Sequence, residues 1–409
     1  MGVIITGIGM LNALGVGRGP YWQELLTGNC GIRPIESFDT SPYRTNVGGE
    51  IRSFDPKVFM PPRFYRRLSR LSRLAVAASI EALEDSELEL GKNDRDRVGA
   101  VFGTAFGSTQ QTDAFFMSLL DHGPEAAEPI LFPDTVPNAP ASHVAIYHQL
   151  QGPTSTLCQN HLSGECALAF AISLLETNQA DALVVGGADE LTSILFRSLD
   201  AIGALKVWHG RERFDPGQLL PGRGFIPGEG ATCLVVEREG DAKKRKTLAH
   251  GELLSLTLAS AATSQGHYDQ DGVSLARTIS AALDEAQLKP DEIDLIGLAA
   301  NGVKELEDAE ARALERVFGP RWHQTPRMPL RYFVGEFGSA GLLTAATIML
   351  ALREGVLPPS IQGRELTGVP GDPLRFAPAR EARLRAAMSI GSTFGGGSSC
   401  LIVAKADLR

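Results

Sequence analysis

Hydrophobic residues along the chain fall into two kinds of stretch. Short runs rich in β-branched residues are typical of buried strands, and longer segments with apolar residues three and four positions apart are typical of helices. Their alternation predicts an α/β fold in which sheets and helices form layers. The expected strands are VIITGIG (3–9), VGAVFGTAF (98–106), STLCQN (155–160), ALVVGGA (182–188), GATCLVVE (230–237), IDLIGLAAN (293–301), AAMSIGST (386–393) and SCLIVAKA (399–406).

Three segments predict helices of different burial. Within residues 66–86, apolar side chains at spacings of three and four predict one buried face, with the arginines outside. GECALAFAISLLETNQ (164–179) and GSAGLLTAATIMLALREG (338–355) are apolar almost all round, so we expect both to be buried on every side. Residues 158–170 predict a strand that enters the first of these two helices through a tight turn at His161. The expected core positions of residues 66–86 are Leu68, Leu71, Ala75, Ala78 and Ala82.

The charged segment EREGDAKKRKTLAHGE (237–252) separates two stretches of similar plan. The chain has 409 residues, more than the usual single core of about 100–200 residues. We expect the segment to be poor in helix and to divide the chain into halves at 1–245 and 246–409. The sequence leaves open whether the halves arose by duplication.

Composition and charge exclude several classes of protein. The chain is 43% hydrophobic and 21% charged, which is typical of a globular protein, and its net charge of -9 argues against nucleic acid as the main partner. No apolar run reaches the roughly 18 residues of a membrane span, and the N-terminus lacks the basic region of a signal peptide. Gly2 and Thr6 match a loose myristoylation pattern, but a buried first strand explains them better. We expect no membrane association.

The cysteines predict neither disulfides nor a metal site. Their number is odd, they lie mostly in apolar runs, and no CxxC pair occurs. We therefore expect a protein of the reducing cytoplasm that holds no metal. The five cysteines are Cys30, Cys158, Cys166, Cys233 and Cys400.

Four segments, in order along the chain, resemble landmarks of one enzyme family, the elongating β-ketoacyl-(acyl carrier protein) synthases, and the similarity runs nearly from end to end. This resemblance implies the thiolase fold, two related α/β halves in five αβαβα layers. It also implies a partner, the acyl carrier protein with its phosphopantetheine-bound acyl chain, and no cofactor. The segments are residues 3–39 (VIITGIG…ESFD), 152–165 (GPTSTLCQNHLSGE), 213–237 (RFDPGQLLPGRGFIPGEGATCLVVE) and 392–404 (STFGGGSSCLIVA).

The family condenses an acyl chain with a malonyl unit through a cysteine at a helix start and two histidines from the second half. A helix N-terminus lowers the pKa of such a thiol and offers N–H groups to an oxyanion. Here the cysteine position is His161, the two histidine positions are Asn301 and Glu336, and a family lysine is Arg331. Because all three catalytic side chains differ, we expect no condensing activity from this chain alone.

Two cysteines lie near the lost nucleophile, and we expect neither to replace it. Cys158 precedes the turn on a strand, and Cys166 lies about 140° round the helix from His161. Free cysteine is among the most buried residue types. We therefore expect both to be core thiols.

Two interpretations of His161 remain open. In one, its imidazole is a base or transient acyl acceptor that Glu336 orients, as in an acyltransferase, cyclase or hydrolase acting on a carrier-bound acyl chain. In the other, His161 and Glu336 fill the vacated space and hydrogen-bond to each other. Chain-length factors, the non-condensing partners of active ketosynthases, are the relatives expected to lose the whole catalytic set. We favour that function, in a heterodimer with a catalytic ketosynthase in fatty acid or polyketide biosynthesis; a homodimer is the alternative.

The resemblance also indicates how an acyl chain would be held. Phe394 occupies the place of the family's gating phenylalanine, Gly395 and Gly396 let backbone approach a thioester, and Ser398 replaces a family asparagine. Phe106 lies where the family tunes acyl-chain length across the dimer interface; the alternative is a core phenylalanine at a strand end.

A cluster of arginines is the expected docking surface for the acidic carrier protein. It comprises Arg63, Arg66, Arg67 and Arg70, with Arg73 beyond them. A solvated helix face is the alternative explanation.

Overall fold

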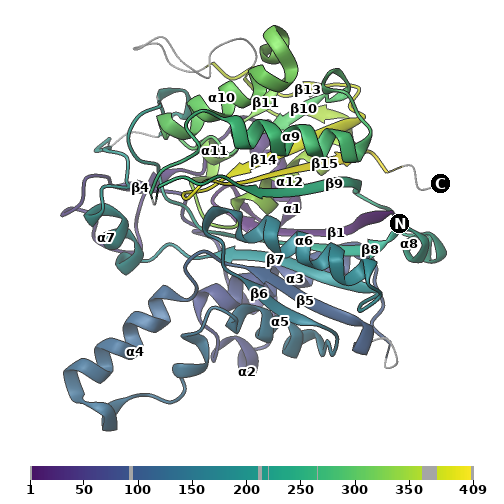
Figure 1. Ribbon diagram of the computed structural model, residues 1–409. Coiled ribbons are helices and arrows are strands. Elements are labelled where there is room, and N and C mark those ends of the chain that lie inside the picture. The colour runs from purple at the N-terminus through teal and green to yellow at the C-terminus, as the bar shows by residue number, and fades with distance from the viewer. Residues whose placement is uncertain are drawn as a thin grey trace.

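The computed structural model of the protein describes residues 2–91, 95–210, 214–219, 221–264, 266–361 and 375–406. An 11-stranded sheet path crosses the molecule in the order β11-β10-β14-β15-β9-β1-β8-β7-β5-β6, with β2 (Gly15–Val16) paired to β1. β1 pairs with β9 only through Val3, Ile4 and Ile5. This short contact joins two sets of five strands into one hydrogen-bonded path (Figure 1).

The two sets of five strands have the same internal plan. The N-terminal set runs antiparallel from β1 to β8 to β7 and then parallel to β5 and β6. The C-terminal set repeats this pattern from β9 to β15 to β14, β10 and β11. The bounds are β1 Val3–Asn12, β5 Val98–Gly103, β6 Thr154–Leu157, β7 Ala182–Asp189, β8 Gly230–Arg238, β9 Gly251–Ser260, β10 Leu295–Gly297, β11 Arg327–Met328, β14 Ala386–Ser392 and β15 Gly397–Ala404.

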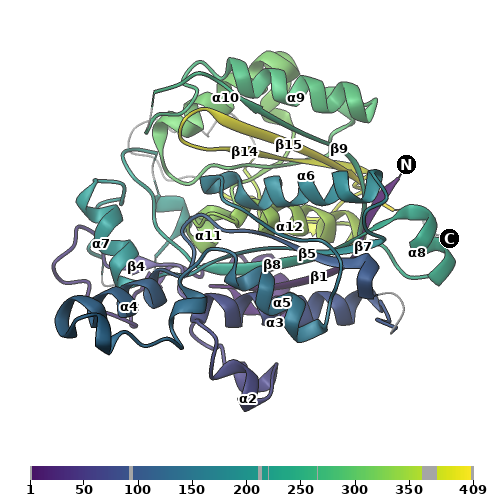
Figure 2. The same cartoon turned by 60° about the horizontal axis from the view of Figure 1, so that its bottom comes forward.

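Helices complete a five-layer αβαβα arrangement, as the thiolase-fold prediction requires. α3 (Arg70–Ser86) and α5 (Ala139–His148) cover the outer face of the N-terminal strands, and α9 (Val273–Ala286) packs on β9 and β15 with α10 (Lys304–Phe318) against it. α6 (Ser163–Glu176) and α12 (Ala340–Glu354) lie between the two sets of strands, where Figure 2 shows them in the central layer.

Smaller elements connect these layers. The helical ones are α1 Arg18–Leu26, α2 Pro62–Tyr65, α4 Thr109–His122, α7 Ser193–Ala201, α8 Glu239–Arg245 and α11 Arg331–Val334, and the short strands are β3 Arg33–Pro34, β4 Val47–Gly48, β12 Val356–Leu357 and β13 Arg380–Glu381. None of the helices in the described residues is long and apolar enough to cross a membrane.

The structure confirms the layered α/β prediction and corrects some of its details. Strand β9 was not among the expected strands; its first six residues alternate between buried and partly exposed positions, and its last four are partly or fully exposed. The segment 237–252 contains helix α8 and is therefore not poor in helix. The boundary at residue 245 stays a prediction.

The three helix predictions differ in outcome. α12 is buried throughout Ala340–Leu352, as expected. α6 is not buried on every side, because Phe170 is 40% exposed. α3 begins at Arg70, and all five expected core positions of residues 66–86 are buried, including Leu68 just before the helix.

Candidate functional site

His161 lies in a turn between a strand and a helix, as its sequence predicts. Strand β6 ends just before it, and the 3-10 turn Asn160–Leu162 leads directly into helix α6. Asn160 has a φ of 48°, in the left-handed region that asparagine adopts more readily than most residues. The tight turn therefore places the His161 side chain at the mouth of the helix.

Aromatic rings surround His161. The side chain is only 5% exposed, and its ring centroid lies 6.0 Å from that of Phe225 and 5.4 Å from that of Phe394. Tyr268 extends the cluster, with its ring centroid 4.8 Å from Phe394. Burial lowers the pKa of His161, and the nearby Glu336 carboxylate opposes this only in part. The imidazole is therefore neutral at neutral pH, when it can accept one proton but carries no charge.

Glu336 and Asn301, which the sequence resemblance assigns to the family's two histidine positions, bind each other. The Asn301 Nδ2 donates to Glu336 Oε2 at 2.7 Å, and the Asn301 Oδ1 accepts from the Val303 backbone N–H at 3.1 Å. The Arg331 Nε donates to Glu336 Oε1 at 3.1 Å, while its Nη1 donates to the Leu298 carbonyl at 3.0 Å. Glu336 is thus held by an amide and a guanidinium in the protein interior.

The pairing of His161 with Glu336, which both interpretations of His161 assumed, is not formed. Among the described residues, His161 makes ring contacts but no hydrogen bond to Glu336. The two residues nevertheless lie in the same region, because the Glu336 backbone N–H donates to the carbonyl of Ile226, which follows the His161 contact Phe225. The structure therefore brings all three positions together, but it does not arrange His161 and Glu336 as an acid–base dyad.

Three more buried glutamates lie near this site and were missed in the sequence. Burial raises the pKa of Glu165 and Glu307 to about 7 and that of Glu310 to about 8. Glu307 accepts from the Tyr332 hydroxyl at 2.7 Å, and Glu310 accepts from the Ala299 N–H at 2.8 Å. A glutamate inside the apolar run GECALAFA was the available signal for Glu165, because a carboxyl group on a buried helix is costly without compensation.

A cavity of about 1070 Å³ opens onto His161 from the surface. Phe106, Phe394 and Gly395 line it, together with Asn160 and Tyr268. Phe106 is 41% exposed and follows the end of β5, so it is not a core phenylalanine. Gly396 does not line this cavity. It has a φ of 84°, and a Cβ there would lie 2.5 Å from the Ala261 carbonyl oxygen, so its need for glycine is conformational.

The prediction that both neighbouring cysteines are core thiols is wrong. Cys158 is exposed and Cys166 is partly buried, whereas Cys30, Cys233 and Cys400 are buried. Cys158 follows the edge strand β6, whose outer side is unpaired within the described residues. Burial nevertheless raises the pKa of Cys158, and it raises that of Cys166 to about 11. Both thiols are therefore weaker nucleophiles at neutral pH than an ordinary cysteine.

The arginine cluster divides into two parts. Arg63, Arg66 and Arg67 are exposed on and beside α2. Arg70 donates from Nη2 to Glu229 Oε1 at 2.6 Å and to the Ile51 carbonyl at 3.0 Å. Because Arg70 already binds an internal carboxylate, a carrier protein could use only the exposed three without breaking that pair.

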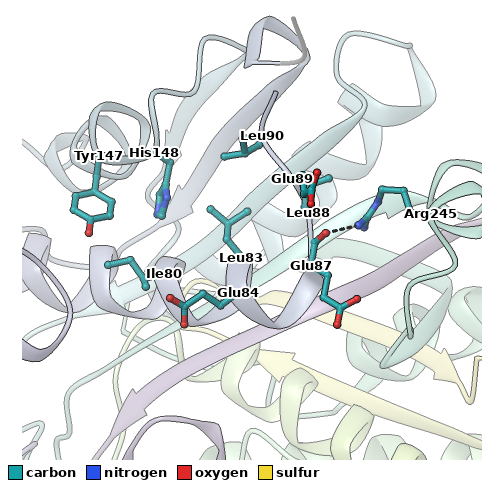
Figure 3. A pocket seen from close by; sticks show the side chains of 10 residues that line it. All are labelled: Ile80, Leu83, Glu84, Glu87, Leu88, Glu89, Leu90, Tyr147, His148 and Arg245. Atoms are coloured by element: carbon teal, nitrogen blue, oxygen red, sulfur yellow. Dashed lines mark hydrogen bonds between the residues drawn. The ribbon is translucent and has the colours of Figure 1, made fainter. Parts of the chain in front are cut away.

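A second cavity, of about 940 Å³, lies elsewhere on the N-terminal half (Figure 3). The C-terminal part of α3, the end of α5 and Arg245 form its walls, and Glu84, Glu87 and Glu89 are at its rim. None of the residues predicted from the sequence lines it. We therefore place the functional site at His161, where the chemistry of the side chains converges. No group of three metal-binding side chains occurs in the described part of the chain.

Comparisons with known proteins show the family to which this chain is similar. Residues 2–242 match the model of the "Beta-ketoacyl synthase, N-terminal domain" and residues 250–364 match that of the "Beta-ketoacyl synthase, C-terminal domain". The "3-oxoacyl-(acyl-carrier-protein) synthase 2" of Coxiella burnetii is 28% identical, covering 98% of each chain. The "Tetracenomycin polyketide synthase ketoacyl synthase alpha subunit" of Streptomyces glaucescens is 31% identical, covering 98% of this chain and 97% of the relative.

Solved structures of similar fold include ketosynthases. A chain of "The ishigamide ketosynthase/chain length factor" superimposes with a TM-score of 0.86 at 27% identity, covering 99% of both chains. A "Beta-ketoacyl synthase from Burkholderia phymatum" superimposes with a TM-score of 0.87 at 24% identity and 99% coverage of both, which supports the fold.

Proposed function

Because the chain belongs to the β-ketoacyl synthase family, we propose that it is a non-condensing member of that family, a chain-length factor. In this proposal it pairs with an active ketosynthase in polyketide-type or fatty acid biosynthesis and shapes the tunnel for the acyl chain. The pair works in the cytoplasm, where the five cysteines stay as free thiols.

The observation that carries the proposal is the buried arrangement of Asn301, Glu336 and Arg331. In the family, two histidines bind the malonyl carbonyl and stabilise the enolate. Here the Asn301 amide donates to Glu336, and a carboxylate stands where the second histidine would donate. A carboxylate repels a developing enolate or oxyanion. Because His161 replaces the thiol, the chain also lacks an acceptor for the acyl chain. It therefore lacks the groups for both acyl transfer and enolate stabilisation.

Features of the surface support pairing with another subunit. Helix α4 contains no buried residue, and β6 leaves one sheet edge unpaired within the described residues. Unpaired strand edges and exposed apolar helices are typical of association surfaces. The exposed Arg63, Arg66 and Arg67 are then candidates for contacts with the acidic carrier protein and its phosphopantetheine-bound acyl chain. Some similar solved structures are described as complexes of a ketosynthase with a chain-length factor or a carrier protein.

A second function is favoured by the cavity at His161. A neutral imidazole at the end of a cavity of about 1070 Å³ could act as a base on a carrier-bound acyl chain, as in an acyltransferase, cyclase or hydrolase. Glu336 does not orient that imidazole in this structure, so His161 would act without the expected dyad.

The test is condensation by a reconstituted pair. Purified with a ketosynthase that carries an intact Cys-His-His set, the chain should support product formation, and the chain alone should form none. Replacing the partner's catalytic cysteine by alanine should abolish the product of the pair. Product that persists with that partner variant would show that this chain condenses, and would overturn the proposal.

A further inference from the structure

A long part of the chain contains no lysine or arginine. From Val98 to Phe196 the sequence has none, although the same stretch contains Asp113, Asp121, Glu125, Glu128, Asp134, Glu165, Glu176, Asp181, Asp189 and Glu190. It includes α4, the segment that follows it, edge strand β6 and helix α6. The surface expected to meet another subunit is therefore built without lysine or arginine.

The most exposed part of this stretch is an apolar arm, residues 109–138, which projects from the body of the molecule (Figure 1). Ring contacts join α4 to the segment after it, because the centroid of Phe115 lies 5.7 Å from those of both Phe116 and Phe132. Large apolar side chains are nevertheless exposed on the arm: Phe116 by 51%, Met117 by 46%, Leu120 by 76%, Ile130 by 62% and Phe132 by 58%. Such a patch is typical of a protein–protein interface.

Acidic side chains accompany this apolar surface. Asp121, Glu125 and Glu128 are exposed at the far end of the arm, and none of the three forms an ion pair within the described residues. Asp134 is different, because it is buried and binds His143 and the Ser69 N–H. The arm thus presents apolar groups and three negative charges that form no ion pair in the described residues, with no lysine or arginine of its own.

From this arm we infer the kind of partner that the chain selects. In a symmetric homodimer both subunits use the same patch, so a contact between the two arms would bring acidic side chains together without a lysine or arginine. Like charges at an interface oppose association, and complementary charges favour it. The arm therefore fits a different subunit whose facing surface combines apolar side chains with lysines or arginines. This inference rests on the proposed pairing and deepens it, because it explains the choice of a heterodimer over a homodimer.

Basic residues outside the arm could pair with its acidic side chains in a second copy of the chain. Arg197 is exposed on α7, which packs against α4, and Arg63, Arg66 and Arg67 are exposed on and beside α2. If these arginines of a second copy contacted the arm, a homodimer would form, and the parent chain would associate with itself tightly at low salt.

The experiment mixes the chain with a charge-reversed copy of itself. The variant Asp121→Lys/Glu125→Lys/Glu128→Lys should associate with the parent chain roughly tenfold or more tightly than the parent associates with itself, at about 50 mM salt. Sedimentation velocity measures both affinities. Salt at about 500 mM shortens the screening length, so it should strengthen parent self-association and weaken the mixed pair. A matched control reverses Asp284, Asp291 and Glu315, exposed acids of the opposite half, and its mixture should behave like the parent alone.

Two results would overturn the inference. One is a parent homodimer that is tight at low salt and is not strengthened by high salt. The other is a mixture with the arm variant that is no tighter than the mixture with the control. Neither result depends on catalysis, so the proposed non-condensing function is judged separately by the reconstituted condensation assay.

Discussion

Arg331 Nε lies 3.1 Å from both carboxylate oxygens of Glu336, and each side chain is only 2% exposed. The sequence resemblance assigns these two positions to a catalytic histidine and a lysine of condensing relatives. Removing one partner of a buried ion pair leaves a charge without compensation. Glu336 is therefore held in the core by Arg331 and Asn301, whereas His161 is not part of this network.

Removing one charge of this ion pair should destabilise the fold more than removing both charges. Arg331→Met should lower the free energy of unfolding by about 3–5 kcal/mol, because Glu336 would remain buried without its guanidinium. The double variant Arg331→Met/Glu336→Leu should recover most of this loss, since it removes both charges. Urea denaturation of both variants is the measurement, and a double variant as unstable as the single one would contradict the assignment.

Conservative changes at His161 and Glu336 separate the two candidate functions. In a chain-length factor, His161→Gln and Glu336→Gln should still assemble with the active ketosynthase and give product within a few-fold of the parent. A catalytic base at His161 would instead lose roughly 100- to 10,000-fold in turnover. Product formation at saturating carrier protein is measured, with assembly checked by size exclusion. Intact assembly with abolished turnover would favour the acyl-transfer function.

We expect iodoacetamide to label Cys158 of the isolated chain slowly, at a rate that depends on pH. Its thiol is exposed, so iodoacetamide should modify it, but its raised pKa leaves less thiolate at a given pH than an ordinary cysteine has. The rate should therefore be lower than that of glutathione at pH 7.5 and should rise with pH. Mass spectrometry locates the label, and Cys158→Ser should remove it. Rapid stoichiometric labelling at neutral pH would show an activated thiol.

We expect the variant Phe106→Ala, which removes the ring, to give longer acyl products. Because Phe106 lines the cavity and is 41% exposed, Phe106→Ala should cost less than the roughly 3–5 kcal/mol typical of a buried phenylalanine. If the ring limits chain length, the reconstituted pair should make longer acyl chains with this variant, as mass spectrometry of the products would show. A stable variant with unchanged products would leave Phe106 without a role in chain length.

The buried glutamates predict that stability falls as pH rises. The pKa of Glu165 and Glu307 is raised to about 7 and that of Glu310 to about 8, from an ordinary value of 4.5. Between these values the three glutamates bind more protons in the folded chain than in the unfolded chain, so their contribution to the free energy of unfolding decreases from about pH 4.5 to about pH 8. Glu310→Gln should flatten this decrease while keeping an acceptor for the Ala299 N–H. Denaturation curves across this pH range test it, and an unchanged slope would rule out Glu310 as a contributor.

The sequence by itself determined the layered α/β fold, because strand and helix periodicity are patterns among neighbours in the chain. Its resemblance to a known family predicted that His161 stands at the position of the catalytic cysteine. The same resemblance predicted that Asn301 and Glu336 stand at the family's two histidine positions.

Only the tertiary structure decided which of these side chains bind one another and which are buried. Glu336 binds Asn301 and Arg331 but not His161, because the direction of each side chain depends on how three separate segments pack. Cys158 is exposed because β6 lies at the edge of the sheet. The order of strands in a sheet cannot be derived from the local sequence pattern of each strand. The matching plan of the two halves is likewise a property of strand pairing, which joins residues far apart in the chain.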